Sequence, residues 1–271
     1  MGAVQQLWVA TNGITLSNSW QQGFASGSRG QSAKTNSWKV RPVRAFGGTL
    51  GCADGGTCVV GDTGPGGGIV FYVAGANFTS TGSDCGTACR YLEAAPTDQS
   101  TGVVWATTAA ACYPTGSDSG TSDCQLNSIY SNTSGQAASR TAATGIGAGM
   151  ANTNQIYARL TTAGSALTSA YAAGIAWAYT NNGRSDWHLP SKDELNELCK
   201  YAKNTGQAAG GATLCSGGAD AAVRGFTATN YWSSSEDSAV NAWQHSFFDG
   251  SRGANSKFST TNYVRVVRAF G

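Results

Sequence analysis

The order of apolar and polar positions predicts strands at the two ends of a long region, with helices between them. A continuous apolar run at 69–74 predicts a strand, and shorter runs at 91–96 and 103–105 predict two more. From about residue 150, apolar residues recur three or four positions apart, which is the spacing of an amphipathic helix. This spacing predicts helices over 151–160 and 165–179.

A third helix is indicated by the residues of its first turn. Ser191 follows Pro190 and stands three positions before Glu194, so that the two side chains can form a capping box. We therefore expect a helix over 191–202. In the preceding helix, one face is expected to carry four apolar residues: Leu167, Tyr171, Ile175 and Tyr179.

After residue 215 the pattern returns to strands that are rich in aromatic residues. Strands are predicted at 229–236, 242–248 and 263–270, with turns around Asp249 and Ser251. Apolar residues do not alternate cleanly in the last segment, which favours a central strand that is covered on both faces. Strands, then helices, then strands indicate an α+β fold, with a mixed, mostly antiparallel sheet and two or three helices.

The beginning of the chain is a second copy of its end. Residues 20–47 read WQQGFASGSRGQSAKTNSWKVRPVRAFG, and residues 243–271 read WQHSFFDGSRGANSKFSTTNYVRVVRAFG. Further upstream, Trp8 precedes Trp232 by 224 positions. The sequence therefore predicts a complete unit at 48–271 that follows a partial repeat at 1–47.

The partial repeat is a strand-forming arm that lacks helices of its own. Such a segment cannot bury its apolar side chains alone, so it must pack on the following unit or on another molecule. If residues 1–47 add strands to a neighbouring molecule, the chain self-associates head to tail. The alternative interpretation of the duplication is structural: the chain is a repeat subunit of a surface fibre or layer.

Composition narrows the class of protein. Only 12% of the residues are charged, and Gly, Ser, Thr, Ala and Asn take their place, which is typical of extracellular modules. The net charge of +2 is too small to predict a nucleic-acid partner. No apolar run approaches 18 residues, so we expect no membrane insertion. The first residues lack the basic and apolar regions of a signal peptide.

The eight cysteines favour an exported protein with loops pinned by disulfides. We expect nearest-neighbour pairing, although zinc ligation is the competing interpretation. Zinc is disfavoured because the spacings lack paired CxxC motifs and the two histidines are distant in sequence. The expected pairs are Cys52 with Cys58, Cys85 with Cys89, Cys112 with Cys124, and Cys199 with Cys215.

Residues that could support catalysis are few, and we expect no enzyme activity and no cofactor. His188 and His245 are the two histidines, and neither has an acidic or cysteine companion at ligand spacing. The serines at 233–235 lack the GxSxG motif of a nucleophile elbow. Glu93 and Glu236 could meet in space, but a local hydrogen bond or an arginine partner is favoured for each.

A metal site is not expected either. Calcium needs clustered carboxylates, and the sparse acidic residues offer only Glu236 and Asp237 with Asp249. Arg265 and Arg268 are expected to pair with a buried Glu or to cap the end of a strand.

Seven segments occur in an order that resembles a known family. They are GDTGPGGGIVFYV, YLEAAP, ANTNQI, DWHLPSKDELNEL, YWSSSE, AW..SF..G and VRVVRAF, and they cover most of residues 60–271. This succession resembles the Lcl C-terminal domain family of bacterial surface proteins. The resemblance implies a C-type-lectin-like fold, an extracellular or cell-surface location, and binding of a ligand, including sulfated glycans, rather than catalysis. Extra cysteines, an insertion at 107–145 and the N-terminal copy depart from the family pattern.

Differences between the two copies nominate a binding surface, because scaffold positions tolerate less change. Neutral drift explains the same differences equally well. Arg252 and Lys257 are present in both copies and could meet a sulfate or carboxylate, and Phe248 could stack on a sugar ring. We expect an extracellular glycan or protein ligand. The candidate binding residues are Asp237, Asn241, His245, Phe248, Asp249, Arg252, Asn255 and Lys257.

Overall fold

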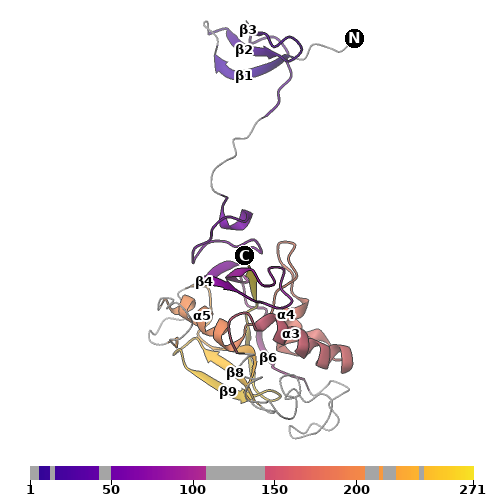
Figure 1. The fold of residues 1–271 in the computed structure, drawn as a ribbon, viewed down its shortest axis with the longest axis vertical. Coiled ribbons are helices and arrows are strands. Elements are labelled where there is room, and N and C mark those ends of the chain that lie inside the picture. Colours follow the sequence, from indigo (N-terminus) through magenta and orange to yellow (C-terminus); the bar gives the residue numbers. More distant parts are fainter. Residues whose placement is uncertain are drawn as a thin grey trace. The chain divides into compact units, whose positions relative to one another are not determined.

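A computed structural model describes most of the chain. The described residues are 6–12, 16–42, 50–107, 144–204, 214–215, 224–237 and 241–271. The chain divides into two compact units, Met1–Gly48 and Thr49–Gly271 (Figure 1).

The N-terminal unit is a three-stranded antiparallel meander. Strands β1 (Gln6–Asn12), β2 (Asn18–Gly23) and β3 (Arg29–Ala33) pair in chain order. No helix occurs among the described residues of this unit. The side chain of Phe24, directly after β2, leaves 67% of its surface exposed. The meander therefore presents an apolar residue that it does not cover itself.

The larger unit contains a five-stranded sheet with the order β6-β10-β7-β8-β9. All neighbouring strands are antiparallel except β10 and β7, which run parallel. The strands are β6 (Ser100–Val104), β7 (Asn230–Glu236), β8 (Asn241–Ser246), β9 (Arg252–Ser256) and β10 (Thr261–Val264).

A second, three-stranded antiparallel sheet joins the two ends of the larger unit. Its order is β11-β5-β4, formed by β4 (Ile69–Phe78), β5 (Cys89–Ala94) and β11 (Val267–Phe270). The C-terminal strand β11 consequently pairs with β5, and β4 lies on the other side of β5. The unit is α+β with mostly antiparallel sheets, as the sequence predicts.

The predicted single strand at 263–270 is wrong, because the chain changes sheets within it. β10 belongs to the five-stranded sheet and β11 to the three-stranded one. Arg265 lies between them, and its guanidinium forms an ion pair with Asp98 at 2.7 Å. The same guanidinium donates to the backbone oxygens of Ala95 and Gly225 at 2.8 and 2.7 Å. These long-range bonds hold the bend, and the local sequence pattern does not reveal them.

The predicted helix at 165–179 is also interrupted. A 3₁₀ turn, η3 (Thr168–Ala170), precedes α4 (Ala172–Ala178), and Tyr171 between them has extended backbone angles. The Tyr171 hydroxyl contacts that of Thr161 at 2.8 Å, and the tyrosine is fully buried. Leu167, expected on the same buried face, is instead 74% exposed. The earlier helix is present as α3 (Gly149–Tyr157), which continues into a π-helical segment, η2 (Ala158–Ala163).

Helix α5 (Lys192–Lys203) begins with the predicted capping box. The Ser191 hydroxyl accepts from the Glu194 backbone N–H at 3.3 Å, and the Glu194 carboxylate accepts from the Ser191 N–H at 2.8 Å. Successive residues of β7 point to opposite faces of its sheet, as in any strand. Tyr231 faces the cluster that includes α5, and Trp232 faces the cluster that includes α3 and α4.

Three of the four predicted disulfides are present: Cys52–Cys58, Cys85–Cys89 and Cys199–Cys215. Cys112, Cys124 and nearly all of the insertion at 107–145 lie outside the described residues. In the part of the chain that is described, no helix combines the length and apolar character needed to cross a bilayer.

Candidate functional site

The repeated sequence forms the same strand pairing in both units. In the N-terminal meander Trp8 pairs with Gln21, and in the larger unit Trp232 pairs with Gln244. The second pair of strands matches in the same way, because all five partner pairs of β2 and β3 recur between β8 and β9. We call β7, β8 and β9 the C-terminal meander, and β1, β2 and β3 the N-terminal meander.

The turn between β8 and β9 is fixed by its own side chains. Asp249 Oδ1 accepts from the Ser251 backbone N–H at 2.9 Å and from its hydroxyl at 2.7 Å. These hydrogen bonds, the backbone one foremost, lower the pKa of Asp249 to about 2. Gly250 supplies the left-handed backbone that the turn requires, with φ at 79°. In the N-terminal copy Ser26 replaces the aspartate and accepts from the Ser28 N–H at 3.3 Å.

Phe248 projects from this turn with 61% of its surface exposed. The backbone beneath it is held by Lys203 at the end of α5, whose ammonium donates to the oxygens of Phe247 and Phe248 at 3.3 and 2.6 Å. The N-terminal copy has Ala25 at the corresponding position. Because the copy forms the same turn with alanine, the aromatic ring is not needed to make the turn.

Cationic groups lie on the same face of the C-terminal meander as α5. Arg252, at the start of β9, forms a partly exposed ion pair with Asp193 at 3.4 Å. Desolvation is the main cause that raises the pKa of Asp193. Next to it, the Lys192 ammonium lies 4.6 Å from the centre of the Trp243 ring. Arg252 and Lys192 therefore both lie where the first turn of α5 packs on the C-terminal meander.

Two predicted binding residues are buried, which corrects their assignment as ligand contacts. Lys257 is fully buried, and its ammonium lies 2.6 Å from a carboxylate oxygen of Glu236 and 4.9 Å from the Trp105 ring centre. His245 is 1% exposed, and its Nε2 lies 3.0 Å from the backbone oxygen of Gly250. Both side chains lie inside the fold and offer a glycan or protein ligand no surface.

The remaining predicted residues lie at the other end of β8. Asp237, Asn241 and Asn255 are half-buried, and the Asp237 N–H donates to the Asn241 backbone oxygen at 3.0 Å. A six-residue strand spans about 20 Å, so these three residues are separated from the turn. Phe248 and Arg252 stand on either side of the β8–β9 turn, and this second group lies apart from it.

Sequence reasoning missed Lys192 and Asp193 as neighbours of β8 and β9. They are the first two residues of α5, and only the packing of α5 on β8 brings them to Arg252. The capping box located this helix end along the chain, but no sequence signal indicated which strand it would approach.

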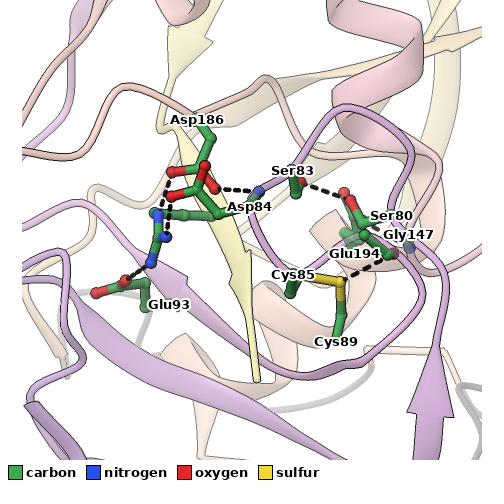
Figure 2. Close-up of a disulfide and its surroundings, with 11 residues drawn as sticks. Ser80, Ser83, Asp84, Cys85, Cys89, Glu93, Gly147, Asp186 and Glu194 are labelled. Carbon is green, nitrogen blue, oxygen red and sulfur yellow. Dashed lines mark hydrogen bonds and ion pairs between the residues drawn. A yellow bond between two sulfur atoms is a disulfide. The ribbon is translucent and has the colours of Figure 1, made fainter. Parts of the chain in front are cut away.

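The expected arginine–glutamate pairing is present at Arg268. This buried side chain forms ion pairs with Glu93 and Asp84, each at 3.2 Å, and with Asp186 (Figure 2). Glu93 also accepts from the backbone N–H groups of two glycines in the 64–68 turn. Glu93 and Glu236 therefore each have their own cationic partner and do not form the pair considered from sequence.

A cleft of about 390 Å³ lies over this cluster. Its walls include Asp54, Tyr91, Arg184 and the C-terminal Gly271, and Arg268 forms part of its lining. Arg184 and Asp84 form an exposed ion pair at 3.5 Å at its rim. The cleft is a second surface where a ligand could bind, distinct from the β8–β9 turn.

The model of the Lcl C-terminal domain matches residues 95–268. This chain belongs to the Lcl C-terminal domain family. The match runs from β6 to the first two residues of β11, includes the candidate turn, and confirms the family that the sequence motifs indicate. Membership indicates a surface-associated protein.

Other comparisons add little to the Lcl assignment. A fimbrial protein from Bacteroides ovatus ATCC 8483, known from its crystal structure, is similar with 15% identity and a TM-score of 0.44. The alignment covers 93% of this chain and 57% of that chain, and at this level it supports no conclusion about fold or function. No curated protein matches the chain.

Proposed function

We propose that this Lcl domain protein is an extracellular binding module that captures a glycan or protein ligand through the β8–β9 turn. The observation that carries the proposal is the exposed Phe248 ring on a turn that is rigidly held. Asp249 and Gly250 fix the turn locally, and Lys203 fastens it to α5. A rigid support lowers the entropy that binding would otherwise cost.

The side chains around the turn suit a ligand with an apolar face and an anionic group. An aromatic ring can stack on the apolar face of a sugar or on a protein side chain. Arg252, the first residue of β9, can donate charge-assisted hydrogen bonds to a sulfate or carboxylate. The Asp249 carboxylate accepts two hydrogen bonds from Ser251, so its negative charge is already engaged within the turn.

We extend the proposal to a C-type-lectin-like fold. Antiparallel sheets, loops closed by local disulfides and a binding surface near the C-terminal strands support this assignment.

The proposal is tested by binding of the full chain to arrays of glycans, sulfated ones included, and to immobilised extracellular proteins. Phe248→Ala introduces the residue that the N-terminal copy carries, so the turn should still form. We expect this variant and Arg252→Ala each to weaken binding at least tenfold, as for residues at the centre of an interface. Leu167→Ala is the matched control, because it removes another exposed apolar side chain.

Two outcomes would count against this site. If both turn variants bind as well as the parent chain, the turn is not the binding surface. If only Arg184→Ala abolishes binding, the ligand occupies the 390 Å³ cleft instead.

A second candidate function is structural: the chain is a subunit of a surface fibre or layer and assembles through residues 1–47. Residues that the C-terminal meander buries are exposed in its copy. Phe24 is 67% exposed where Phe247 is fully buried, and Lys34 is exposed where Lys257 is fully buried. The same scaffold thus lacks within one unit the covering that it has within the other, and in this proposal a second molecule supplies that covering.

Light scattering of the full chain tests this second function. The average molar mass should rise with protein concentration, and Phe24→Ser should lower this mass. Val59→Ser changes an exposed residue of the larger unit and should leave the mass unchanged. A monomeric mass at every concentration would rule out assembly through the N-terminal meander.

A further inference from the structure

The Cys199–Cys215 disulfide lies against the imidazole of His245. Cys199 is on α5 and His245 is on β8, and the packing of this helix on this strand brings them together. One sulfur from each cysteine and one ring nitrogen of the histidine all lie within 4.8 Å of one another. Within the described parts of the chain, this is the one group of three side chains with metal-ligand spacing.

The hydrogen bonding of His245 leaves one ring nitrogen available. Its Nε2 lies 3.0 Å from the Gly250 backbone oxygen, and a carbonyl oxygen can only accept. The proton is therefore on Nε2, and Nδ1 carries a lone pair. Nδ1 is buried without a hydrogen-bond partner among the residues that the structure describes. Metal-ligating histidines characteristically donate their other N–H to a backbone carbonyl or carboxylate in this manner.

The surroundings keep the imidazole in the form that binds metal. Desolvation is the largest cause that lowers the pKa of His245, to about 4, so the ring is neutral at pH 7. Lys200 and Arg252 also act on the ring electrostatically in this direction.

We propose that reduction of the Cys199–Cys215 disulfide converts this cluster into a zinc site with two thiolates and His245 Nδ1 as ligands. A dithiol or phosphine reductant supplies the two electrons, and the disulfide takes up two protons to give two thiols. Zn²⁺ then displaces those two protons. Two thiolates neutralise the dication, so the buried site carries no net charge. Cys₂His with an open fourth position is a known zinc ligand set.

The protein framework holds the ligands close before any metal arrives. The Cα atoms of the two cysteines lie 5.9 Å apart. In a tetrahedral site the two sulfurs would stand about 3.8 Å apart, given zinc–sulfur bonds of about 2.3 Å. Cys215 is also held by its backbone N–H, which donates to Asn196 Oδ1 at 2.9 Å. Disulfide and zinc would thus each tie the same segment to α5.

The N-terminal copy supplies a control for the histidine. Gln22 stands where the C-terminal meander has His245, and its side-chain amide donates to the Ser28 backbone oxygen at 3.1 Å. Ser28 corresponds to Ser251 in the turn. His245→Gln therefore keeps a donor toward the turn and removes the imidazole.

Cobalt(II) titration of the full chain tests the proposal, with a phosphine reductant and without oxygen. The reduced parent chain should bind cobalt(II), and the complex should show a thiolate-to-cobalt charge-transfer band. Added zinc should abolish this band by displacing the cobalt. His245→Gln should weaken this binding at least tenfold, and Cys199→Ser/Cys215→Ser should abolish it. Cys85→Ser/Cys89→Ser, which removes another local pair, should leave it unchanged.

Three results would overturn the assignment. Equal affinity in the His245→Gln variant would show that histidine is not a ligand. Retention of the band without Cys199 and Cys215 would place the metal elsewhere. If the reduced chain unfolds, its thiols would bind cobalt independently of His245, and the first comparison would again reject the site.

Discussion

Replacing Lys257 by methionine should destabilise the larger unit by about 3–5 kcal/mol. The Lys257 and Glu236 side chains are 0% and 1% exposed, and their charged atoms lie 2.6 Å apart. An exposed ion pair contributes about 0–1 kcal/mol because water screens it. At this buried pair, removal of the ammonium leaves the Glu236 charge without its cation in surroundings where charge is poorly solvated. Methionine has nearly the shape of lysine, so the cost arises from charge rather than from a cavity.

The N-terminal copy provides the matched control for this prediction. Lys34 occupies the corresponding position after β3, but it is exposed. Lys34→Met should therefore change the free energy of unfolding by no more than about 0.5 kcal/mol. The two substitutions are chemically identical and differ only in burial.

Urea unfolding of the full oxidised chain, followed by tryptophan fluorescence, measures both variants. Trp105 is a suitable reporter because its ring centre lies 4.9 Å from the Lys257 ammonium. Glu236→Leu/Lys257→Met should recover most of the loss, since replacing both charges by apolar groups is often nearly neutral. The reasoning fails if Lys257→Met costs less than about 1 kcal/mol, or if Lys34→Met costs as much.

Three further predictions can be checked by the same unfolding measurement. The free energy of unfolding should fall as pH drops from 6.5 to 4, because His245 takes up its proton at a higher pH in the unfolded chain than in the folded one. The loss should reach about 3 kcal/mol and should be absent in His245→Gln. Replacing Cys199 and Cys215 by serine, which opens a bridge with a separation of 16, should cost about 3 kcal/mol, and an unchanged urea midpoint would contradict this. Arg268→Met should cost at least about 3 kcal/mol, because Glu93 and Asp186 lose their buried partner; a cost below about 1 kcal/mol would argue against it.

Features that depend on neighbours along the chain were predictable from sequence. The Ser191–Glu194 capping box joins residues three positions apart, so its geometry follows once the helix forms. The disulfides Cys52–Cys58 and Cys85–Cys89 link cysteines six and four positions apart, and the chain has little freedom to pair them otherwise. Family membership followed from motifs in order, each of which is a local segment.

Features that depend on distant contacts were not predictable. The helix over 165–179 breaks at Tyr171, because a buried contact with Thr161 outweighs the apolar periodicity. The strand at 263–270 divides between two sheets, because Arg265 bonds to residues far away in sequence. The sequence disfavours zinc because the histidines are far from the cysteines along the chain. In the folded chain, however, the packing of β8 on α5 places His245 next to Cys199.

The duplicated segment separates the two kinds of information most clearly. Sequence by itself determined that two meanders share one scaffold, and their strands do pair in the same register. It could not determine that Lys257 is buried while the identical Lys34 is exposed. Burial is set by whatever packs on a strand, and that partner comes from elsewhere in the chain. Only the tertiary structure therefore decided which shared residues form the core and that Phe248 remains at the surface.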